Sequence, residues 1–459
     1  MGGLTARLGH RPTIVWTGWG GLGPLPYGVL FGVVFFAYEW WRWATLQSTA
    51  YDLAYFDQVV WNASQGHGFV SSFASYPFFG QHFSPALAAL VPLYVVSPSP
   101  LWLLAAQSLA LGAALAPVYK LAERLLGGRV APLAGAAYVL QLFILRAVNF
   151  DFHTEALAVP FVFWAVLAAV RDQRLVLLLA GLVPLLCKED GALVSLGVGF
   201  LAWAVFKRRA GLVLMGVALI YGLVVMLVVM PFLRHGAPGD LFWRYGYLGQ
   251  SAPAILTSLV TRPQLVIGHL LTPAPLGALT LILAGLGFLP LLRPLALAAA
   301  LPALLLALLS THVPQETLAD HYGLQAGPLL FTAALLGWRR VRSPAIPGVA
   351  LLVAAAFIAL VWAPRPTLAG WDRAHDAATL AARIPPRDAV AASSQILPRL
   401  AHRSSISLFP NYDASWVLID RTQTGPAEIT ALRSHGYVEA DVAGDYSLWR
   451  RPSDAYLSY

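Results

Sequence analysis

The sequence predicts an all-α polytopic membrane protein with a small α/β domain at its C-terminal end. Of the 459 residues, 58% are hydrophobic and only 11% are charged, and the mean hydropathy is +0.66. A water-soluble protein carries roughly 25% charged residues, so a soluble fold is excluded for most of the chain. Long apolar runs recur up to residue 363, and the composition changes abruptly after Pro364.

The apolar runs predict about eleven transmembrane helices, because a spanning helix needs about 20 mainly apolar residues. The expected spans are 26–46, 101–120, 130–147, 156–171, 174–188, 191–206, 210–232, 272–292, 295–310, 322–338 and 344–363. Basic residues cluster at every second junction, as at 207–209, and the positive-inside rule places these junctions in the cytoplasm. We therefore expect a plasma (inner) membrane protein with residues 1–25 inside and residues 364–459 outside. The first run lacks a cleavage site and is expected to remain as a span.

Three segments on the expected outer side are too long to be plain turns. They are 47–100, 234–250 and 310–323, and the first contains an apolar run, 86–96, that is too short to span and is expected to lie along the membrane surface. Most acidic residues before residue 371 fall on this side. Because acidic residues have little influence on orientation, their asymmetry predicts a polar site facing the exoplasm.

The C-terminal segment has the composition of a soluble domain. Residues 371–459 hold nine Lys or Arg and ten Asp or Glu. Strand-like runs are expected at 389–393, 404–409, 414–420 and near 446–451, with helix-like runs at 396–402 and 427–436. The net charge of +8 thus arises in the apolar part, where topology explains it better than a nucleic-acid partner. A single cysteine, Cys187, excludes an intrachain disulfide.

The first outer segment opens with two acids, Asp52 and Asp57, in YDLAYFDQ. A spacing of five places them about 140° apart on a helix, so both cannot point into one small site. Each is either a solvated surface acid or a site residue, and the aromatic surroundings favour a site residue because an acid near lipid is costly unless it is used or paired. His82, in GQHFSP, is either a packed residue or a site residue.

A second polar group, NFDFHTEAL, lies at a short outer turn and contains Asp151, His153 and Glu155. Alternate spacing lets all three face one way in an extended chain, which would suit a metal or a sugar. The spacing is not that of a zinc motif. The sequence has no Walker-type loop or dinucleotide fingerprint, so it requires no cofactor, and it leaves a divalent cation open.

A third polar group, LCKEDG, lies between two short spans and contains Lys188, Glu189 and Asp190. The neighbouring charges either neutralise one another or leave Lys188 to bind a phosphate as a compact cation. Arg234, Arg244 and His321 lie in the other outer segments and would extend the same anion site.

These motifs carry a resemblance to a known family. YDLAYFDQVVWN, GQHFSPALAALVPLY, NFDFHTEALAVP, LCKEDGALVSL and DHYGLQAGPLL resemble a family of predicted bacterial and archaeal membrane proteins, domain of unknown function 2079. The likeness runs from about Tyr51 to Asp420. More broadly, the chain resembles the GT-C superfamily, the polytopic transferases that take a sugar from a polyprenyl-phosphate carrier outside the cytoplasm. Within that superfamily it resembles the protein mannosyltransferases and the aminoarabinose transferase of lipid A.

The resemblance implies roles for single residues. Asp52 takes the place of the Asp that opens the first outer loop in those enzymes, which implies a catalytic base, but the acid that follows it there is Leu53 here. His82 takes the place of the Lys of their Lys-Pro-Pro-Leu motif. Glu155 matches the acid of Thr-Asp-x-Leu, and Lys188 matches the Lys of Leu-Thr-Lys-Gly, which implies a contact with the donor phosphate.

The expected function is therefore a membrane glycosyltransferase of GT-C-like fold. It would move a sugar from a polyprenyl-phosphate donor to a lipid, glycan or protein acceptor on the extracytoplasmic side, by a single inverting displacement. The expected catalytic residues are Asp52, Glu155 and Asp57; the expected phosphate ligands are His82, Lys188, Arg244 and His321; and Asp151, His153, Glu189 and Asp190 are further candidates. A transporter or flippase for a lipid or small solute, or an inactive scaffold, is the alternative.

Overall fold

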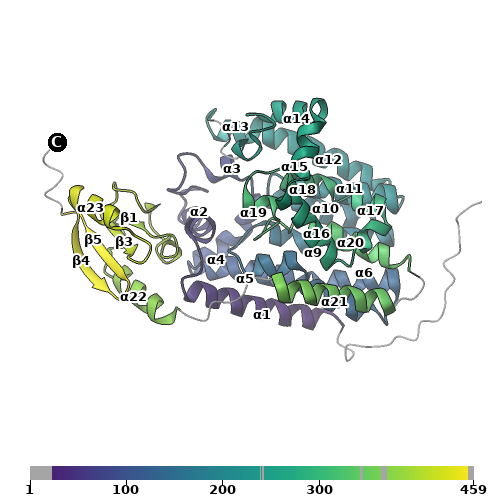
Figure 1. Cartoon of the computed structure of the whole chain (residues 1–459), viewed down its shortest axis with the longest axis horizontal. Helices are drawn as coiled ribbons and strands as arrows, with labels where there is room; N and C mark the ends of the chain where they lie inside the picture. The colour runs from purple at the N-terminus through teal and green to yellow at the C-terminus, as the bar shows by residue number, and fades with distance from the viewer. Residues whose placement is uncertain (1–22, 238, 240–241, 342–344, 363–369, 453–459) are drawn as a thin grey trace, which may run out of the picture.

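The computed structural model describes residues 23–237, 239, 242–341, 345–362 and 370–452. Helices from α1 to α21 form one elongated body, and a smaller part with a sheet follows at one end of it (Figure 1). The expected inner segment, 1–25, lies almost wholly outside the described residues.

The first helix, α1 (Leu25–Ala44), packs along α5 (Leu101–Ala113) at very short range. Glycines permit this crossing. A Cβ on Gly112 would lie 2.3 Å from the carbonyl oxygen of Gly28 and 2.5 Å from the amide nitrogen of Gly32. Small residues are typical of helix pairs in membranes because they let backbones approach closely.

The segment 47–100, called the first outer segment after its expected side, is mostly helical. It contains η1 (Ala50–Ala54), a single π-helical turn, followed by α2 (Tyr55–Ser64), α3 (Phe78–Gln81), η2 (Pro85–Leu90) and α4 (Val91–Val96). The short apolar helix expected over 86–96 is present as η2 and α4.

The remaining helices complete the body. They are α6 (Leu115–Leu126), α7 (Ala131–Val139), α8 (Leu142–Val148), α9 (Glu155–Arg171), α10 (Arg174–Cys187), α11 (Gly191–Phe200), η3 (Leu201–Val205), α12 (Ala210–Val224), η4 (Val225–Val229), α13 (Met230–Leu233), η5 (Phe242–Tyr245), α14 (Ala252–Thr261), α15 (Pro263–Leu270), α16 (Pro273–Gly285), η6 (Leu289–Leu292), α17 (Pro294–Ala298), α18 (Leu301–Leu308), α19 (Val313–Glu316), α20 (Gly327–Trp338) and α21 (Ala345–Trp362).

The number of expected spans is not confirmed. Within the described residues, only Leu101–Leu126, Ala210–Leu233 and Ala345–Trp362 are by themselves long and apolar enough to cross a membrane. Two further pairs qualify only if each bent pair is one span: α7 with α8, bent by 42°, and α15 with α16, bent by 64°. The prediction counted apolar residues, whereas the helices break where the chain bends. It also missed α14 and α15 as separate helices.

The C-terminal part contains a mixed five-stranded sheet with strand order β2-β1-β3-β5-β4. Its elements are α22 (Trp371–Ala381), β1 (Val390–Ala392), η7 (Leu397–Arg399), β2 (Ile406–Leu408), β3 (Trp416–Asp420), α23 (Pro426–Ser434), β4 (Val438–Ala443) and β5 (Tyr446–Arg450). The expected strands are present, but the helix expected at 396–402 is only the short η7. The sequence prediction missed α22 and β4, and β4 is an edge strand whose mostly exposed side chains give no apolar pattern.

The C-terminal part packs on the first outer segment rather than standing apart from it. Leu46, Ala50 and Ala54 share a hydrophobic cluster with residues of α22, β1 and η7. The Ala50 amide donates to Ser394 Oγ at 3.2 Å, and Arg399 donates to the Ala44 carbonyl at 2.7 Å. These contacts hold η1, the turn that carries Asp52, against the C-terminal part.

Candidate functional site

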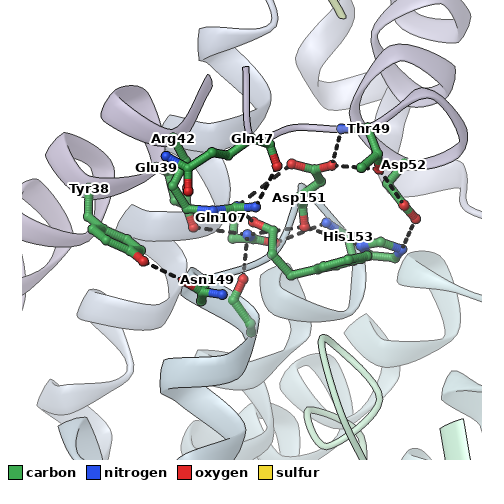
Figure 2. A network of polar contacts seen from close by, with 12 residues as sticks. Tyr38, Glu39, Arg42, Gln47, Thr49, Asp52, Gln107, Asn149, Asp151 and His153 are labelled. Carbon is green, nitrogen blue, oxygen red and sulfur yellow. Dashed lines mark hydrogen bonds and ion pairs between the residues drawn. The ribbon is translucent and has the colours of Figure 1, made fainter. Parts of the chain in front are cut away.

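Most of the polar residues singled out in the sequence meet in one cluster. It lies where η1, the start of α9, the α10–α11 connection (188–190) and the loop 317–326 come together. Figure 2 shows its first part, with Asp52, Thr49, Asp151 and His153 in contact. Segments far apart in the sequence thus build one site beside the C-terminal part.

Asp52 is a partly exposed acid of this cluster. Its side chain is 25% exposed, and its Oδ1 lies 3.4 Å from Nε2 of His153. The Thr49 hydroxyl lies 2.9 Å from a carboxylate oxygen of Asp52 and 2.9 Å from one of Asp151. A hydroxyl has one proton to donate, so it cannot satisfy both carboxylates as anions. Burial, and then the charge of Asp151, raises the pKa of Asp52 to about 7.

Asp151 is the buried member of the carboxylate pair. It accepts a hydrogen bond from the Thr49 amide at 2.7 Å, and Arg42 Nη1 lies 3.8 Å from its Oδ1. Arg42 also donates to the Phe150 carbonyl at 2.8 Å and the Gln47 carbonyl at 2.9 Å. Asp151 is therefore held next to Arg42, and it shares the Thr49 hydroxyl with Asp52.

The imidazoles of His153 and His321 stack on each other next to Asp52. The ring centroids of His153 and His321 are 3.4 Å apart at an interplanar angle of 11°. Burial lowers the pKa of His153 to about 4, and burial followed by the charge of His153 lowers that of His321 well below its usual value. His153 Nδ1 lies 3.2 Å from the Asp151 carbonyl oxygen, which can only accept, so Nδ1 carries the proton of the neutral ring. Nε2 then faces Asp52 with its lone pair, which favours a protonated Asp52.

Lys188 is paired with an acid that is distant in sequence. Its Nζ donates to Glu155 Oε1 at 2.7 Å and lies 3.9 Å from Asp190 Oδ2. Nε2 of His321 lies 3.8 Å from the same Glu155 oxygen, so the stacked imidazoles connect Asp52 to this ion pair. Burial opposes the charge on Lys188, but the charges of Glu155 and Asp190 outweigh it and raise the pKa of Lys188.

His82 forms a second pair nearby. Its Nδ1 lies 3.2 Å from Glu189 Oε1, and the Phe83 amide donates to the other Glu189 oxygen at 3.0 Å. Burial raises the pKa of Glu189, but the interactions with His82 outweigh it and lower that pKa to about 2. Glu189 is therefore a stable anion. Of the two acids that follow Lys188 in the sequence, Glu189 and Asp190, only Asp190 lies within ion-pair distance of it.

Arg244 approaches the cluster from η5. Its Nη1 donates to Gln315 Oε1 at 2.9 Å and to the Tyr322 hydroxyl at 3.2 Å, and the Tyr322 ring lies 4.1 Å from that of His321. Its buried Nε has no hydrogen-bond partner among the described residues. Arg244 is thus a cation with no ion-pair partner in the part of the chain that the structure describes.

Asp57 does not join this cluster. It is 1% exposed, and its Oδ1 accepts from the Tyr94 hydroxyl at 2.7 Å and lies 3.1 Å from His402 Nε2. It therefore belongs to the contact with the C-terminal part. Arg234 also points elsewhere, donating to the Gly80 carbonyl at 2.8 Å.

Sequence reasoning missed Arg42, Thr49 and Tyr322. Arg42 offered a signal, because a charged residue at the end of an apolar span is expected to be paired or functional. Thr49 and Tyr322 gave no such signal in the sequence, except that they lie close to residues already singled out. Within the described residues no three His, Cys, Asp or Glu side chains form a group that could hold a metal ion, so we derive no step through one.

Comparisons with known proteins agree with this architecture. A family model described as "Predicted membrane protein (DUF2079)" matches residues 42–434. No curated protein sequence matches the chain. The crystal structure of ArnT from Cupriavidus metallidurans bound to undecaprenyl phosphate is similar, with a TM-score of 0.52 and 12% identity over 93% of this chain and 98% of that one.

The same ArnT in its apo state gives a TM-score of 0.51 and 12% identity over 92% of this chain and 98% of that one. At this identity the similarity shows a shared fold. It agrees with the expected helical membrane fold. The family match extends over most of the sequence, and the chain therefore belongs to the DUF2079 family of predicted membrane proteins.

Proposed function

We propose that this protein is a membrane glycosyltransferase that moves a sugar from a polyprenyl-phosphate donor to an acceptor hydroxyl on the extracytoplasmic side. The observation that carries the proposal is the polar cluster itself, which joins a half-buried carboxylate with a pKa of about 7 to two cations through stacked imidazoles. ArnT, a GT-C glycosyltransferase bound to undecaprenyl phosphate, has the same fold and supports the same reaction class.

The proposed topology follows from the reaction. Residues 26–363 form the membrane domain with the outer loop 47–100, the N-terminal segment is cytoplasmic, and residues 364–459 form an extracytoplasmic domain. A polyprenyl-phosphate sugar has its lipid in the bilayer and its phosphate at the interface, where cations can hold it. The cluster contains such cations next to apolar helices, as this substrate requires.

Asp52 is the proposed base. The acceptor O–H bond breaks and its proton passes to the Asp52 carboxylate, while the acceptor oxygen forms a bond to the anomeric carbon. The bond from that carbon to the phosphate oxygen breaks, and its electron pair leaves with the polyprenyl phosphate. One displacement inverts the anomeric configuration. A base with a pKa near the working pH combines a useful fraction of anion with a strong affinity for the proton.

Lys188, His82, Arg244 and His321 are the proposed ligands of the donor phosphate. Lys188 has three N–H donors and uses one for Glu155, so two remain for an anion. Arg244 offers its unpartnered Nε. Glu155 is the proposed second carboxylate, and its contact with Lys188 supports a role in orienting that cation.

Product formation in reconstituted vesicles tests the proposal. Vesicles containing the full chain are supplied with sugar-loaded polyprenyl phosphate and a mixture of acceptor hydroxyls, and released polyprenyl phosphate is measured. Asp52→Asn should lower turnover on the order of 10²-fold or more, because a general base contributes that much. Asp57→Asn is the matched control, and near-normal turnover of Asp52→Asn would refute the assignment of Asp52 as the base. Solute flux or lipid transbilayer movement without released polyprenyl phosphate would instead assign the protein to the transporters.

A further inference from the structure

A pocket at the opposite end of the helical body is not used by the proposed reaction. It lies between the end of η3, the start of α12 and α17, and is lined by Phe200, Trp203, Ala204, Lys207, Arg209 and Leu295. In Figure 1, α17 lies at the end of the body away from the C-terminal sheet. The pocket therefore faces the other membrane surface.

The charge around this pocket is one-sided. Lys207 donates to the Ala204 carbonyl at 2.8 Å, and neither it nor Arg209 forms an ion pair within the described residues. The nearby acid Asp172 is already paired with Arg208 at 3.1 Å. Because an ammonium has three donors, Lys207 keeps two for a ligand.

Three more cations lie where α17 begins and α20 ends, and these two helices pack together. Arg293 immediately precedes α17, and burial followed by the charges of Arg340 and Arg339 lowers its pKa. Such mutual repulsion indicates that these guanidinium groups lie close together. No carboxylate forms a salt bridge to any of the three in the described part of the chain. An anion placed here would relieve the repulsion.

The position of the pocket relative to the bilayer indicates which kind of anion would bind there. Lys207 and Arg209 immediately precede Ala210, the first residue of one of the helices long and apolar enough to span. Beside them, Trp203 is 43% exposed, Leu212 is 47% exposed and Leu295 is 58% exposed. A ligand here meets cations at its head and an exposed apolar surface along its tail.

The turn that carries the two cations is fixed in shape. Lys207 adopts a left-handed conformation with φ 61°, its amide donates to the Trp203 carbonyl at 3.1 Å, and the Arg208 amide donates to the Ala202 carbonyl at 2.8 Å. The two side chains therefore extend from a rigid connection, which lowers the entropy lost on binding.

We infer that this pocket binds the phosphodiester headgroup of an anionic phospholipid, with Lys207 and Arg209 on the phosphate and the acyl chains along Trp203, Leu212 and Leu295. Basic pockets between helices at a membrane surface are a known mode of lipid recognition. The inference does not depend on the proposed glycosyltransferase reaction, because it concerns residues at the other end of the body.

Native mass spectrometry of the purified full-length protein tests it, with phosphatidylglycerol as the probe and phosphatidylcholine as the neutral comparison. Phosphatidylglycerol should bind more tightly. The double variant Lys207→Ala, Arg209→Ala should raise its Kd about 30-fold, which is about 2 kcal/mol. The control pair Arg124→Ala, Arg129→Ala removes the same charge from exposed positions in the last turn of α6 and just after it, and should change the Kd less than about twofold.

Equal weakening in both double variants, or none in the first, would overturn the inference. Displacement of the lipid by millimolar inorganic phosphate would also overturn it, because the site would then recognise free phosphate. An unchanged melting temperature of the lipid-free variants shows that folding is intact. The conservative pair Lys207→Arg, Arg209→Lys should retain binding, and its failure to do so would equally count against a charge-based site.

Discussion

Turnover of this protein at saturating donor should rise about tenfold between pH 6 and pH 8. The reason is the pKa of about 7 that burial and the charge of Asp151 give to Asp52. A raised pKa means that the carboxylate, which is the active form of a base, appears only as the pH passes through 7. About one tenth of the Asp52 side chains are then ionised at pH 6 and about nine tenths at pH 8. With the ordinary pKa of about 3.9, the same interval would change turnover by about 1%.

The assay measures released polyprenyl phosphate in vesicles at saturating donor and acceptor, so that binding does not contribute to the pH profile. Asp151→Asn should move the rising limb to lower pH, because it removes the second cause of the shift. Asp57→Asn should leave the limb in place, since Asp57 pairs with His402 and not with the cluster. A flat profile of the unmodified protein, or one that falls between pH 6 and 8, would refute the assignment of Asp52 as the base.

Three further predictions concern the donor, the fold and the topology. Lys188→Ala and His82→Ala should each raise the KM for the donor more than they lower turnover at saturation, and unchanged donor KM in both variants would place the phosphate site elsewhere. Gly112→Ala should destabilise the protein by about 1–3 kcal/mol, seen as a lower melting temperature in detergent, because its Cβ would meet the α1 backbone. Gly216→Ala, where a Cβ meets nothing within 4 Å, is the matched control and should not lower it. A cysteine at the exposed Ser404 should react with an impermeant maleimide in intact cells, and reaction only after permeabilisation would contradict the proposed topology.

The sequence was sufficient to predict a helical membrane body and a polar cluster. The apolar composition excludes a soluble fold, and polar residues that lie near a membrane surface tend to gather where they can be paired. Asp151, His153 and Glu155 do contribute to one cluster, although Glu155 starts α9 instead of continuing an extended chain. Their short separation in sequence made this part of the site visible.

The partners across the fold were not predictable from local patterns. Lys188 lies beside Glu189 and Asp190 in sequence, yet its closest partner is Glu155 on another helix. Asp57 pairs with His402, from the opposite end of the chain. Such contacts depend on how the helices pack against one another, and local sequence patterns do not indicate which helices will pack together. The number of expected spans is not confirmed for a related reason, because breaks such as that between α7 and α8 depend on packing as well as composition.

The contact between the first outer segment and the C-terminal part has a consequence for how the protein is made. The turn that carries Asp52 is synthesised early, but Ser394, Arg399 and His402, which hold that segment, are synthesised near the end. Until these residues have been translated, the apolar side chain of Leu46 has no C-terminal residues to pack against, and the buried Asp57 lacks the imidazole of His402. A newly inserted helical body therefore waits for the last part of the chain before the turn that carries Asp52 is supported. A prematurely terminated chain would leave an inserted body with an unsupported turn.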